Sequence, residues 1–366
     1  MEKLSGEIEK YKEFNDLIFH KKISEVLNGK KIQGVVSIDG ETNIVDTLEI
    51  LKMNRVFSAS IFVPPESNPY NATKEFSKDL VGNYRGMIGT YEIVSFMLGF
   101  FFQDQAVISS SILPGTDKKI VVDAWTNPKP KEIKKRYGYF KETPIVDIIR
   151  LSPHLKENTE LQCYCYTTDT ISMALRQFSE SHLTRLPVVD YDKIVGVLSR
   201  SDILKQLISK ELVDKLPLGV FNSPLSALEG QLQINRDFWT IDESELASYA
   251  FQLMEEHKQQ SIAIIRGKHQ LVSNFSLSDL RGITISNIED LNLPLKEYLA
   301  TLDKPPGQII SITMQTTLLE TIQLIIDSNI HGLWITTTDN TDSSNIIGYL
   351  SVKHLTDLIY HFIKLI

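Results

Sequence analysis

The chain has 366 residues, enough for two to three domains of about 150 residues each. Hydrophobic residues make up 42% and charged residues 23%, a balance typical of folded globular proteins and not of disordered ones. The net charge of −8 argues against binding to nucleic acid, two cysteines offer no disulfide framework, and no apolar run is long enough to span a bilayer. We therefore expect a cytoplasmic protein, with the nucleus as an alternative location, that binds neither nucleic acid nor membranes.

The first predicted elements form one weak structural unit. Residues 1–16 are expected to form a helical extension, and Ile44, Leu48 and Leu51 lie on one face of a later helix. A strand is predicted over residues 60–63, followed by a loop of about twenty residues, and a second strand precedes the run Gly-Thr-Tyr-Glu at 89–92. The order is helix, strand, strand, helix.

The same order recurs three more times, each time with a polar turn between the two strands. Predicted helices, strand pairs and four-residue helix starts lie at 170–180, 186–189, 194–198 and 199–202; at 246–254, 261–265, 271–275 and 276–279; and at 318–326, 333–335, 346–350 and 351–354. We call the runs 89–92, 199–202, 276–279 and 351–354 the signatures of copies one to four. An internal repeat is the strongest feature of this sequence.

A unit of this size cannot bury both faces of its own small sheet, so neighbouring copies should pack sheet against sheet in two pairs. The expected fold class is α+β. The expected domains are an N-terminal helical extension at 1–16, copy one at 17–102, an insertion or linker at 103–142, copy two at 143–210, copy three at 216–284 and copy four at 291–363.

Three motifs carry a resemblance to a known family. These are Thr184-Arg185-Leu186-Pro187-Val188-Val189, the Ser-x-x-Asp signatures of copies two and three, and Ile330-His331-Gly332-Leu333. The sequence resembles the cystathionine-β-synthase (CBS) domain family, and its four copies are similar to the γ-type regulatory subunits of AMP-activated and SNF1-related protein kinases. The resemblance implies four CBS domains in two pairs (Bateman modules) that form a flat disc, nucleotides held in the clefts of each pair, and kinase catalytic and β-type subunits as partners.

The chemistry of the signature can be stated from its residues. A helix start leaves backbone N–H groups unsatisfied and favours negative charge, which suits a nucleotide phosphate. Two carboxylate oxygens suit the paired hydroxyls of a ribose, and an Arg such as Arg185 can bind a phosphate with two parallel hydrogen bonds. Ser-x-x-Asp is also a helix-capping pattern that needs no ligand, and the two roles are compatible. The candidate nucleotide-binding residues are Arg185, Ser199, Arg200, Asp202, Ser276, Asp279, His331, Ser351, Thr168 and Thr240.

The copies are not equally equipped for this chemistry. Glu92 and His354 stand where copies two and three have Asp, and Gly89 replaces the hydroxyl residue of copy one. Phe57, Ser261 and Gly332 stand where relatives of this family often carry Arg or another polar contact. We expect one or two competent sites, which use Asp202 and Asp279.

Other features have open interpretations. His354, Asp357 and His361 share a helix face that is more typical of an interface than of a metal site, and we predict no metal. Cys163 and Cys165 indicate a buried thiol pair before they indicate redox chemistry. The insertion is basic at Lys129, Lys131, Lys134, Lys135, Arg136 and Lys141, which is typical of a solvated loop or of a contact with an acidic partner.

The sequence contains no recognisable catalytic motif, and the repeats occupy nearly the whole chain, so we predict that the protein is not an enzyme. The leading hypothesis is an adenine-nucleotide-sensing regulatory subunit of an SNF1/AMP-activated-type kinase, with AMP, ADP or ATP as ligand and no cofactor. One alternative is a stand-alone four-CBS scaffold, or a phosphatase or stress regulator, whose nucleotide sites have partly decayed. Another is a sensor of S-adenosylmethionine, which needs less basic charge.

Overall fold

The computed structural model describes residues 12–14, 16, 20–28, 35–63, 84–102, 106–112, 119–125, 137–151, 164–181, 184–209, 212–213, 216–257, 259–267, 270–302, 309–337 and 346–364. The loop at 64–83, Cys163 and the basic residues between 129 and 136 lie outside the described residues. Among the described residues, no helix is both long and apolar enough to cross a membrane.

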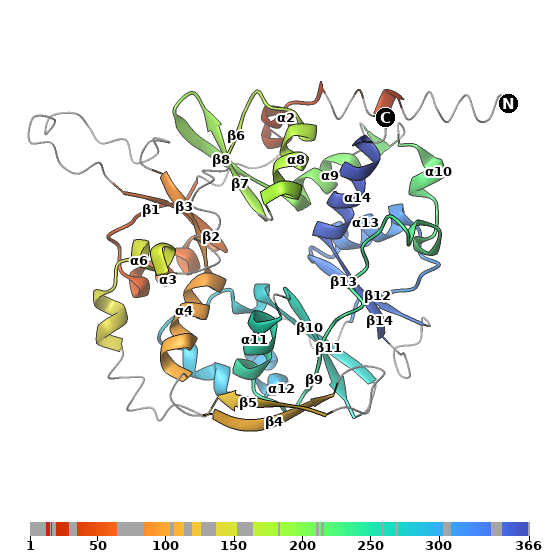
Figure 1. Cartoon of the computed structure of the whole chain (residues 1–366). Helices are drawn as coiled ribbons and strands as arrows, with labels where there is room; N and C mark the ends of the chain where they lie inside the picture. The colour runs from red at the N-terminus through yellow and green to blue at the C-terminus, as the bar shows by residue number, and fades with distance from the viewer. Residues whose placement is uncertain are drawn as a thin grey trace, which may run out of the picture. The chain divides into compact units, whose positions relative to one another are not determined.

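Each copy contains one three-stranded sheet (Figure 1). The strands are β1 (Ser37–Asp39), β2 (Ser58–Phe62) and β3 (Tyr84–Gly89); β6 (Cys165–Tyr166), β7 (Arg185–Asp190) and β8 (Lys193–Ser199); β9 (Thr240–Asp242), β10 (Ser261–Arg266) and β11 (Gln270–Ser276); β12 (Ser311–Ile312), β13 (Gly332–Thr336) and β14 (Ile346–Ser351). In every copy the first strand runs parallel to the middle strand, and the middle and third strands form an antiparallel hairpin.

The four hairpins share one irregularity. The register shifts between the fourth and fifth residues of the middle strand in every copy, at Ile61/Phe62, Val188/Val189, Ile264/Ile265 and Ile335/Thr336. A β-bulge at the same place in four sheets is a structural repeat, because bulges are specific features of a fold. The internal repeat and the α+β class are therefore confirmed.

Two helical elements complete each copy, one before the hairpin and one after the signature. They are α3 (Ile44–Met53) and α4 (Thr90–Phe102); α8 (Ile171–Ser181) and α9 (Arg200–Leu207); α11 (Ala247–Glu256) and η5 (Leu277–Leu280); α13 (Leu318–Asp327) and α14 (Val352–Lys364). The helix predicted after the third signature is only the 3₁₀ turn η5. Gly282, with φ +86°, follows it closely, and this left-handed backbone does not continue a helix.

The described chain divides into two compact units, and neither consists of consecutive copies. Unit 1 contains Met1–Val35, Cys163–Asp237 and Ile310–Ile366, and so holds copies two and four. Unit 2 contains Val36–Gln162 and Phe238–Ile309, and so holds copies one and three. In unit 1 the helices pack together, α14 against α8 and α9, and α13 against α9 (Figure 1). Each unit has its own hydrophobic core.

Consecutive copies exchange the segments that lead into them. Helix α2 (Ile23–Asn28) precedes copy one in the chain but packs on copy two, where Ile23 N donates to Asp169 O at 2.8 Å. Helix α6 (Ile145–Leu151) precedes copy two but packs on copy one, where Ile145 N donates to Thr42 O at 2.8 Å. Each of these two copies is completed by a segment from the start of the other.

Copies three and four repeat the exchange. The segment of α10 (Leu218–Phe221) and η4 (Leu225–Leu228) precedes copy three but packs on copy four, and α12 (Leu295–Thr301), with the 3₁₀ helix η6 (Ile288–Asn292) before it, packs on copy three. The predicted boundaries at 17, 143, 216 and 291 stay predictions, and each is followed by a segment that packs on another copy. The sheet-to-sheet pairing of consecutive copies joins residues of different units and stays a prediction.

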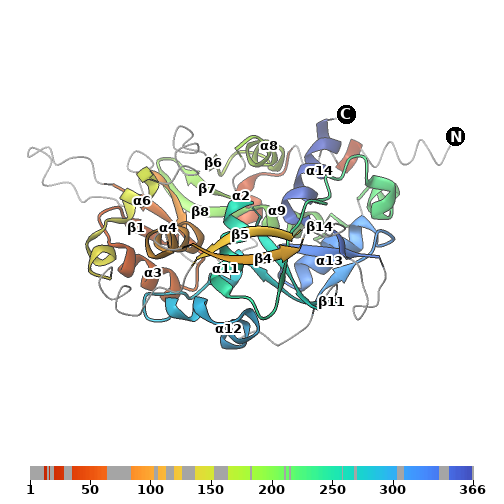
Figure 2. The same cartoon turned by 60° about the horizontal axis from the view of Figure 1, so that its bottom comes forward.

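The predicted insertion at 103–142 contains a strand pair that the sequence did not indicate. β4 (Ala106–Ile112) and β5 (Lys119–Trp125) form an antiparallel hairpin (Figure 2). Strand β4 contacts β9 in unit 2. The end of the insertion also packs on the unit, because Phe140 is fully buried while Tyr137 and Tyr139 are exposed. Part of this segment is therefore structural.

Candidate functional site

Each signature lies at the junction between the third strand of a copy and the element that follows it. Its first residue is paired with the first residue of the middle strand: Gly89 with Ser58, Ser199 with Arg185, Ser276 with Ser261, and Ser351 with Gly332. The structure thus brings Arg185 together with the signature of copy two, as the sequence predicted. In copy one, the strand register places Ser58, the residue after Phe57, opposite the signature.

In copy two, the signature forms a complete capping box at the start of α9. Asp202 Oδ2 accepts hydrogen bonds from Ser199 N at 2.8 Å and from Ser199 Oγ at 2.6 Å, and Asp202 N donates to Ser199 Oγ at 3.3 Å. Asp202 is buried, and Arg185 is only half-buried at the adjacent strand start. A carboxylate and the positive end of a two-turn helix therefore lie together, and Arg185 begins the strand opposite them.

In copy three, the carboxylate makes the same contacts. Asp279 Oδ2 accepts from Ser276 N at 2.7 Å and from Ser276 Oγ at 3.0 Å. Thr240 lies at the same end of the sheet, because it pairs with Ala263 two residues after Ser261. The four-residue η5 has almost no helix dipole, so the anion-attracting part of the predicted site is weaker here than in copy two.

Copies one and four preserve the cap with different side chains. Glu92 Oε2 accepts from Gly89 N at 2.8 Å, and the ring Nδ1 of His354 accepts from Ser351 N at 3.1 Å. Burial is the main reason that the pKa of His354 falls to about 4, with a further lowering by Lys353. The imidazole is therefore neutral at pH 7, as the acceptor role requires. In all four copies the fourth residue of the signature accepts a hydrogen bond from the backbone N–H of the first. Its charge differs, because it is a carboxylate in copies one to three and a neutral imidazole in copy four.

In the signature of copy one, Gly89 and Glu92 replace the Ser and Asp of copies two and three, and the two replacements depend on each other. A Cβ on Gly89 would lie 2.9 Å from Glu92 Oε2 and 3.0 Å from Phe57 O, so the longer carboxylate uses the space that a serine would need. Gly89→Ser is expected to lower the free energy of unfolding by about 1–2 kcal/mol. Adding Glu92→Asp should recover most of this loss, measured by urea unfolding.

The control for this pair is Gly138→Ser, because nothing lies within 4 Å of a Cβ at Gly138. This variant should leave the urea midpoint nearly unchanged. A neutral Gly89→Ser, or a double variant no more stable than the single one, would show that the two positions are not coupled.

Three other predicted residues have clear positions. Thr168 is exposed in the turn after β6, at the far end of the sheet from Arg185 and Ser199, so the structure gives no support to its predicted ligand contact. His331 is exposed directly before Gly332, and its carbonyl accepts from Val352 N at 2.9 Å. It therefore lies at the signature end of copy four, beside the buried Ser351.

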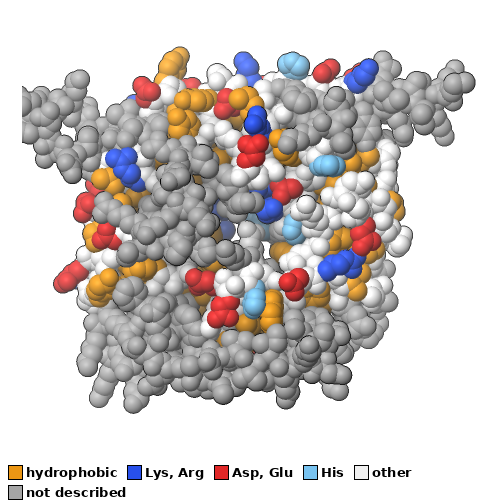
Figure 3. Space-filling model, viewed as in Figure 1, with side chains coloured by type: hydrophobic (Ala, Val, Ile, Leu, Met, Phe, Trp, Pro, Cys, Tyr) orange, Lys and Arg blue, Asp and Glu red, His pale blue; other side chains and the backbone are white. Residues whose placement is uncertain are grey.

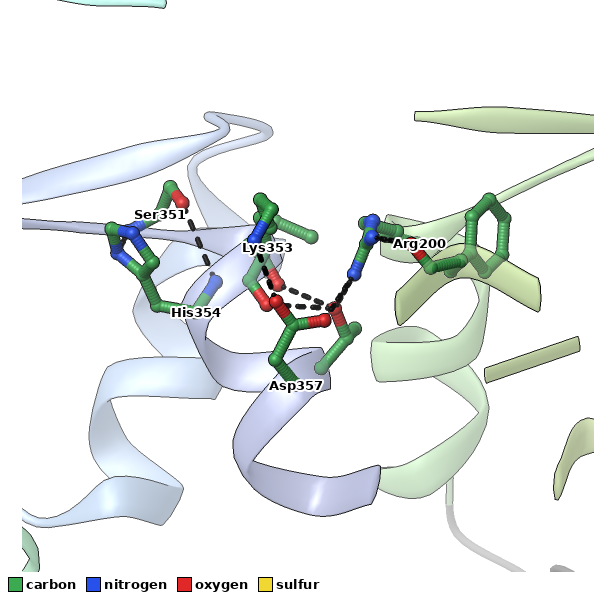
Figure 4. A network of polar contacts seen from close by, with 8 residues as sticks. Arg200, Ser351, Lys353, His354 and Asp357 are labelled. Atoms are coloured by element: carbon green, nitrogen blue, oxygen red, sulfur yellow. Dashed lines mark hydrogen bonds and ion pairs between the residues drawn. The ribbon is translucent and has the colours of Figure 1, made fainter. Parts of the chain in front are cut away.

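Arg200 has a different role from the one predicted. It is 3% exposed, and its guanidinium donates to Thr356 Oγ1 at 2.7 Å, to Asp357 Oδ1 at 2.8 Å and to the carbonyl of Phe178 (Figure 4). The guanidinium also lies 5.0 Å from the centre of the Phe178 ring, and Lys353 Nζ contacts Asp357 Oδ2 at 2.8 Å. Arg200 therefore joins α9 of copy two to α14 of copy four within unit 1.

Tyr349 is a residue at the site that the sequence analysis missed. A Cβ on Gly332 would overlap the Tyr349 hydroxyl, so this side chain fills the space beside the position equivalent to Arg185. The ring also packs on Trp334 with centroids 4.7 Å apart. Only the register of β13 with β14 reveals this exchange, since Gly332 and Tyr349 are 17 residues apart in the sequence.

The described residues give little support for a redox-active thiol or a metal site. Burial raises the pKa of the Cys165 thiol to about 12, and Sγ lies 3.7 Å from Pro187 O, which is typical of an inert core cysteine. The described ranges hold no group of three or more His, Cys, Asp or Glu side chains suited to a metal ion. On the face drawn in Figure 3, the described basic and acidic side chains are interspersed.

Each repeat has a three-stranded sheet and a capped helix start after its hairpin, and this arrangement can be compared with known families. The model of the CBS domain family matches residues 161–209 and 304–361, which cover the hairpins and signatures of copies two and four. Copies two and four therefore contain CBS-domain sequence, as the resemblance predicted.

Two solved structures are similar to this chain. A crystal structure of a proposed archaeal homologue of γ-AMPK from Methanocaldococcus jannaschii has the same fold, with a TM-score of 0.59 and 15% identity over 92% of this chain and 99% of that one. An uncharacterised conserved protein from Pyrococcus horikoshii matches 54% of this chain and 79% of its own, with 18% identity and a TM-score of 0.40.

Among curated proteins, the chain is similar to Protein SDS23 from Yarrowia lipolytica, with 24% identity over 157 residues. The match covers 40% of this chain and 31% of the relative, so it spans about a third of that protein's length.

Proposed function

We propose that this CBS-domain protein is a non-catalytic regulatory protein that senses an adenosyl ligand. The observation that carries the proposal is the corner of copy two, where Arg185, Ser199 and Asp202 meet at the start of α9. The guanidinium and the helix start attract a phosphate, and the carboxylate suits ribose hydroxyls. A carboxylate has about four acceptor positions, so Asp202 can hold the cap and a ribose together.

Copy three supports a second site of a different kind. It has Thr240, Ser276 and Asp279 at one corner, but Ser261 replaces the arginine and η5 replaces the helix. This corner has the groups for a ribose and few for a phosphate. A ligand with little negative charge, such as S-adenosylmethionine, fits copy three better than ATP does, whereas AMP, ADP or ATP fits copy two.

The partner is a finer proposal. We propose that the chain is the γ-type subunit of an SNF1/AMP-activated-type kinase, and the likeness to the archaeal fold over 92% of the chain supports it. Affinity purification of the tagged chain should then recover kinase catalytic and β-type subunits in stoichiometric amounts. Their absence after gentle lysis would refute the kinase role and leave the ligand proposal intact.

A scaffold function is the alternative, and a specific observation favours it. The caps of copies one and four are satisfied by Glu92 and His354 without a ligand, and Tyr349 fills the place of an arginine in copy four. In this case, the four-CBS protein would present surfaces to partners and bind no nucleotide.

Calorimetric titration with AMP, ADP, ATP and S-adenosylmethionine tests the sensor. We expect micromolar binding of an adenine nucleotide that Asp202→Ala weakens by about tenfold or more. Asp202→Asn keeps an acceptor for the cap and removes the charge, so it should also weaken binding while it protects the fold. Asp279→Ala should affect the second site alone.

The matched control is Glu320→Ala, which removes the carboxylate from a capping box at α13. Glu320 Oε2 accepts from Thr317 N at 2.9 Å, and this cap lies at another helix start of unit 1. Its loss should not change ligand affinity. No heat with any of the four ligands, from protein shown to be folded, would refute the sensor and favour the scaffold; equal binding by the Asp variants would place the ligand elsewhere.

A further inference from the structure

Two exposed tyrosines and a half-buried one lie on copy two, and we call them the tyrosine patch: Tyr166, Tyr191 and Tyr164. Tyr164 and Tyr166 contact edge to face, with ring centroids 5.4 Å apart and hydroxyls 3.4 Å apart. Tyr166 is 44% exposed and Tyr191 is 90% exposed. The patch lies at the turn end of β7 and β8, the opposite end of the sheet from Arg185 and Ser199, so it is separate from the proposed nucleotide site.

Tyr191 occupies an unfavourable backbone position. It is the first residue of the two-residue turn between β7 and β8, and its φ of +52° lies in the left-handed region. This conformation costs a bulky residue about 1–2 kcal/mol, and glycine or asparagine would adopt it more easily. The fold therefore gains nothing from a tyrosine here, and the ring makes the turn an aromatic projection into solvent. Strain of this kind is common at functional sites.

Carboxylates surround the patch. Asp169 Oδ2 accepts from Tyr166 N at 2.7 Å, and Asp190 Oδ1 accepts from Thr167 Oγ1 at 2.8 Å. The pKa of the Tyr166 hydroxyl is raised, first by its hydrogen bond to Tyr164 and then by the charges of Asp169 and Asp192. The turn carries Lys193 against Asp190 and Asp192, and Lys22 forms a bridge with Thr170, next to Asp169, so carboxylates are in excess by one. Electron-rich rings and excess negative charge therefore coincide.

We propose that the tyrosine patch is a docking surface for a Lys/Arg-rich segment of a partner protein. Guanidinium and ammonium groups bind both to ring faces and to carboxylates, and the patch offers the two together. Tyrosine adds contact area with little loss of conformational entropy, which makes it a common anchor of protein interfaces. The occupant is set by charge: an acidic or neutral segment would leave Asp169 and Asp192 unmatched.

Fluorescence anisotropy with a defined peptide tests this proposal on the full chain. The probe is a fluorescein-labelled 12-mer of alternating Arg and Ser, and the comparison peptide carries citrulline, the neutral isostere, in place of Arg. The Arg peptide should bind more tightly, and added salt should weaken it. Tyr166→Ala combined with Tyr191→Asn should lower its affinity by about tenfold, since each exposed cation–π contact contributes a factor of about two to five.

Two control variants separate docking at the patch from effects on folding and from loss of an exposed side chain elsewhere. Tyr191→Asn relieves the left-handed backbone, so the urea midpoint should stay the same or rise while peptide binding falls. Met53→Ala removes an exposed hydrophobic side chain from unit 2 and should not affect binding. Equal affinity of the double variant and the original chain, or equal binding of the Arg and citrulline peptides, would refute the proposal; the nucleotide titration is independent of either result.

Discussion

Replacing Arg200 with alanine is expected to lower the free energy of unfolding by about 3–5 kcal/mol. The guanidinium is almost completely buried and donates to Asp357, Thr356 and the carbonyl of Phe178. Its removal takes the donor from the carbonyl of Phe178, leaves Asp357 with the contact from Lys353, and opens a cavity between α9 and α14. Urea unfolding of the full chain measures the loss.

The matched control is Arg176→Ala. Arg176 forms an ion pair with Glu180 at 2.9 Å, but its side chain is 66% exposed on α8 of the same unit. A surface pair of this kind contributes about 0.5 kcal/mol or less. Arg200→Lys should recover little stability, because an ammonium cannot reproduce the fork of contacts. Similar small losses for Arg200→Ala and Arg176→Ala would show that the buried contacts do not hold copies two and four together.

Stability should fall as the pH drops from 7.5 to 5.0, and His354 should account for about 2 kcal/mol of the fall. Burial and Lys353 lower the pKa of His354 to about 4 in the folded protein, against 6.5 for a free side chain, although Asp357 opposes the shift. The unfolded chain therefore binds the proton first, and the stabilisation present at neutral pH is lost below pH 6.5. Protonation also removes the acceptor for Ser351 N.

His354→Asn is the informative variant for this prediction. The amide oxygen can replace Nδ1 as the acceptor at the cap and does not titrate, so the difference in unfolding free energy between pH 7.5 and 5.0 should shrink by about 2 kcal/mol. His361→Asn, at an exposed position further along α14, should keep the dependence of the original chain. The same pH dependence in both variants would assign the effect to other groups.

The helices and hairpins could be predicted because their patterns are long enough to read. Ile171, Ala174, Leu175 and Phe178 have the spacing of a helical stripe, and all four are at most 1% exposed. The parallel strands β1, β6, β9 and β12 were missed because two or three residues cannot show an alternating pattern. The third signature led to the opposite error, because a full helix was predicted where only a 3₁₀ turn forms. The pattern Ser-x-x-Asp indicates where a helix starts but does not indicate its length, which Gly282 limits here.

The candidate site was predictable only in its local part. Ser199 with Asp202 and Ser276 with Asp279 are neighbours in sequence, and their spacing is that of a capping box, which the structure contains. The role of Arg200 depends on Asp357, which lies 157 residues away, and no local pattern reports such a pair. The placement of Tyr349 beside Gly332 is likewise a consequence of strand register.

The exchange of the segments that precede each copy has a consequence for folding during translation. Translation is sequential, but unit 1 draws on the chain from Ile23 in α2 to Lys364 in α14, with copy two in between. When copy two leaves the ribosome, α14 has not yet been made, so Arg200 and the apolar faces of α8 and α9 must wait for it. These surfaces are the kind that chaperones bind on nascent chains. A premature stop codon before α14 should therefore destabilise copy two as well as copy four, although every residue of copy two would be present.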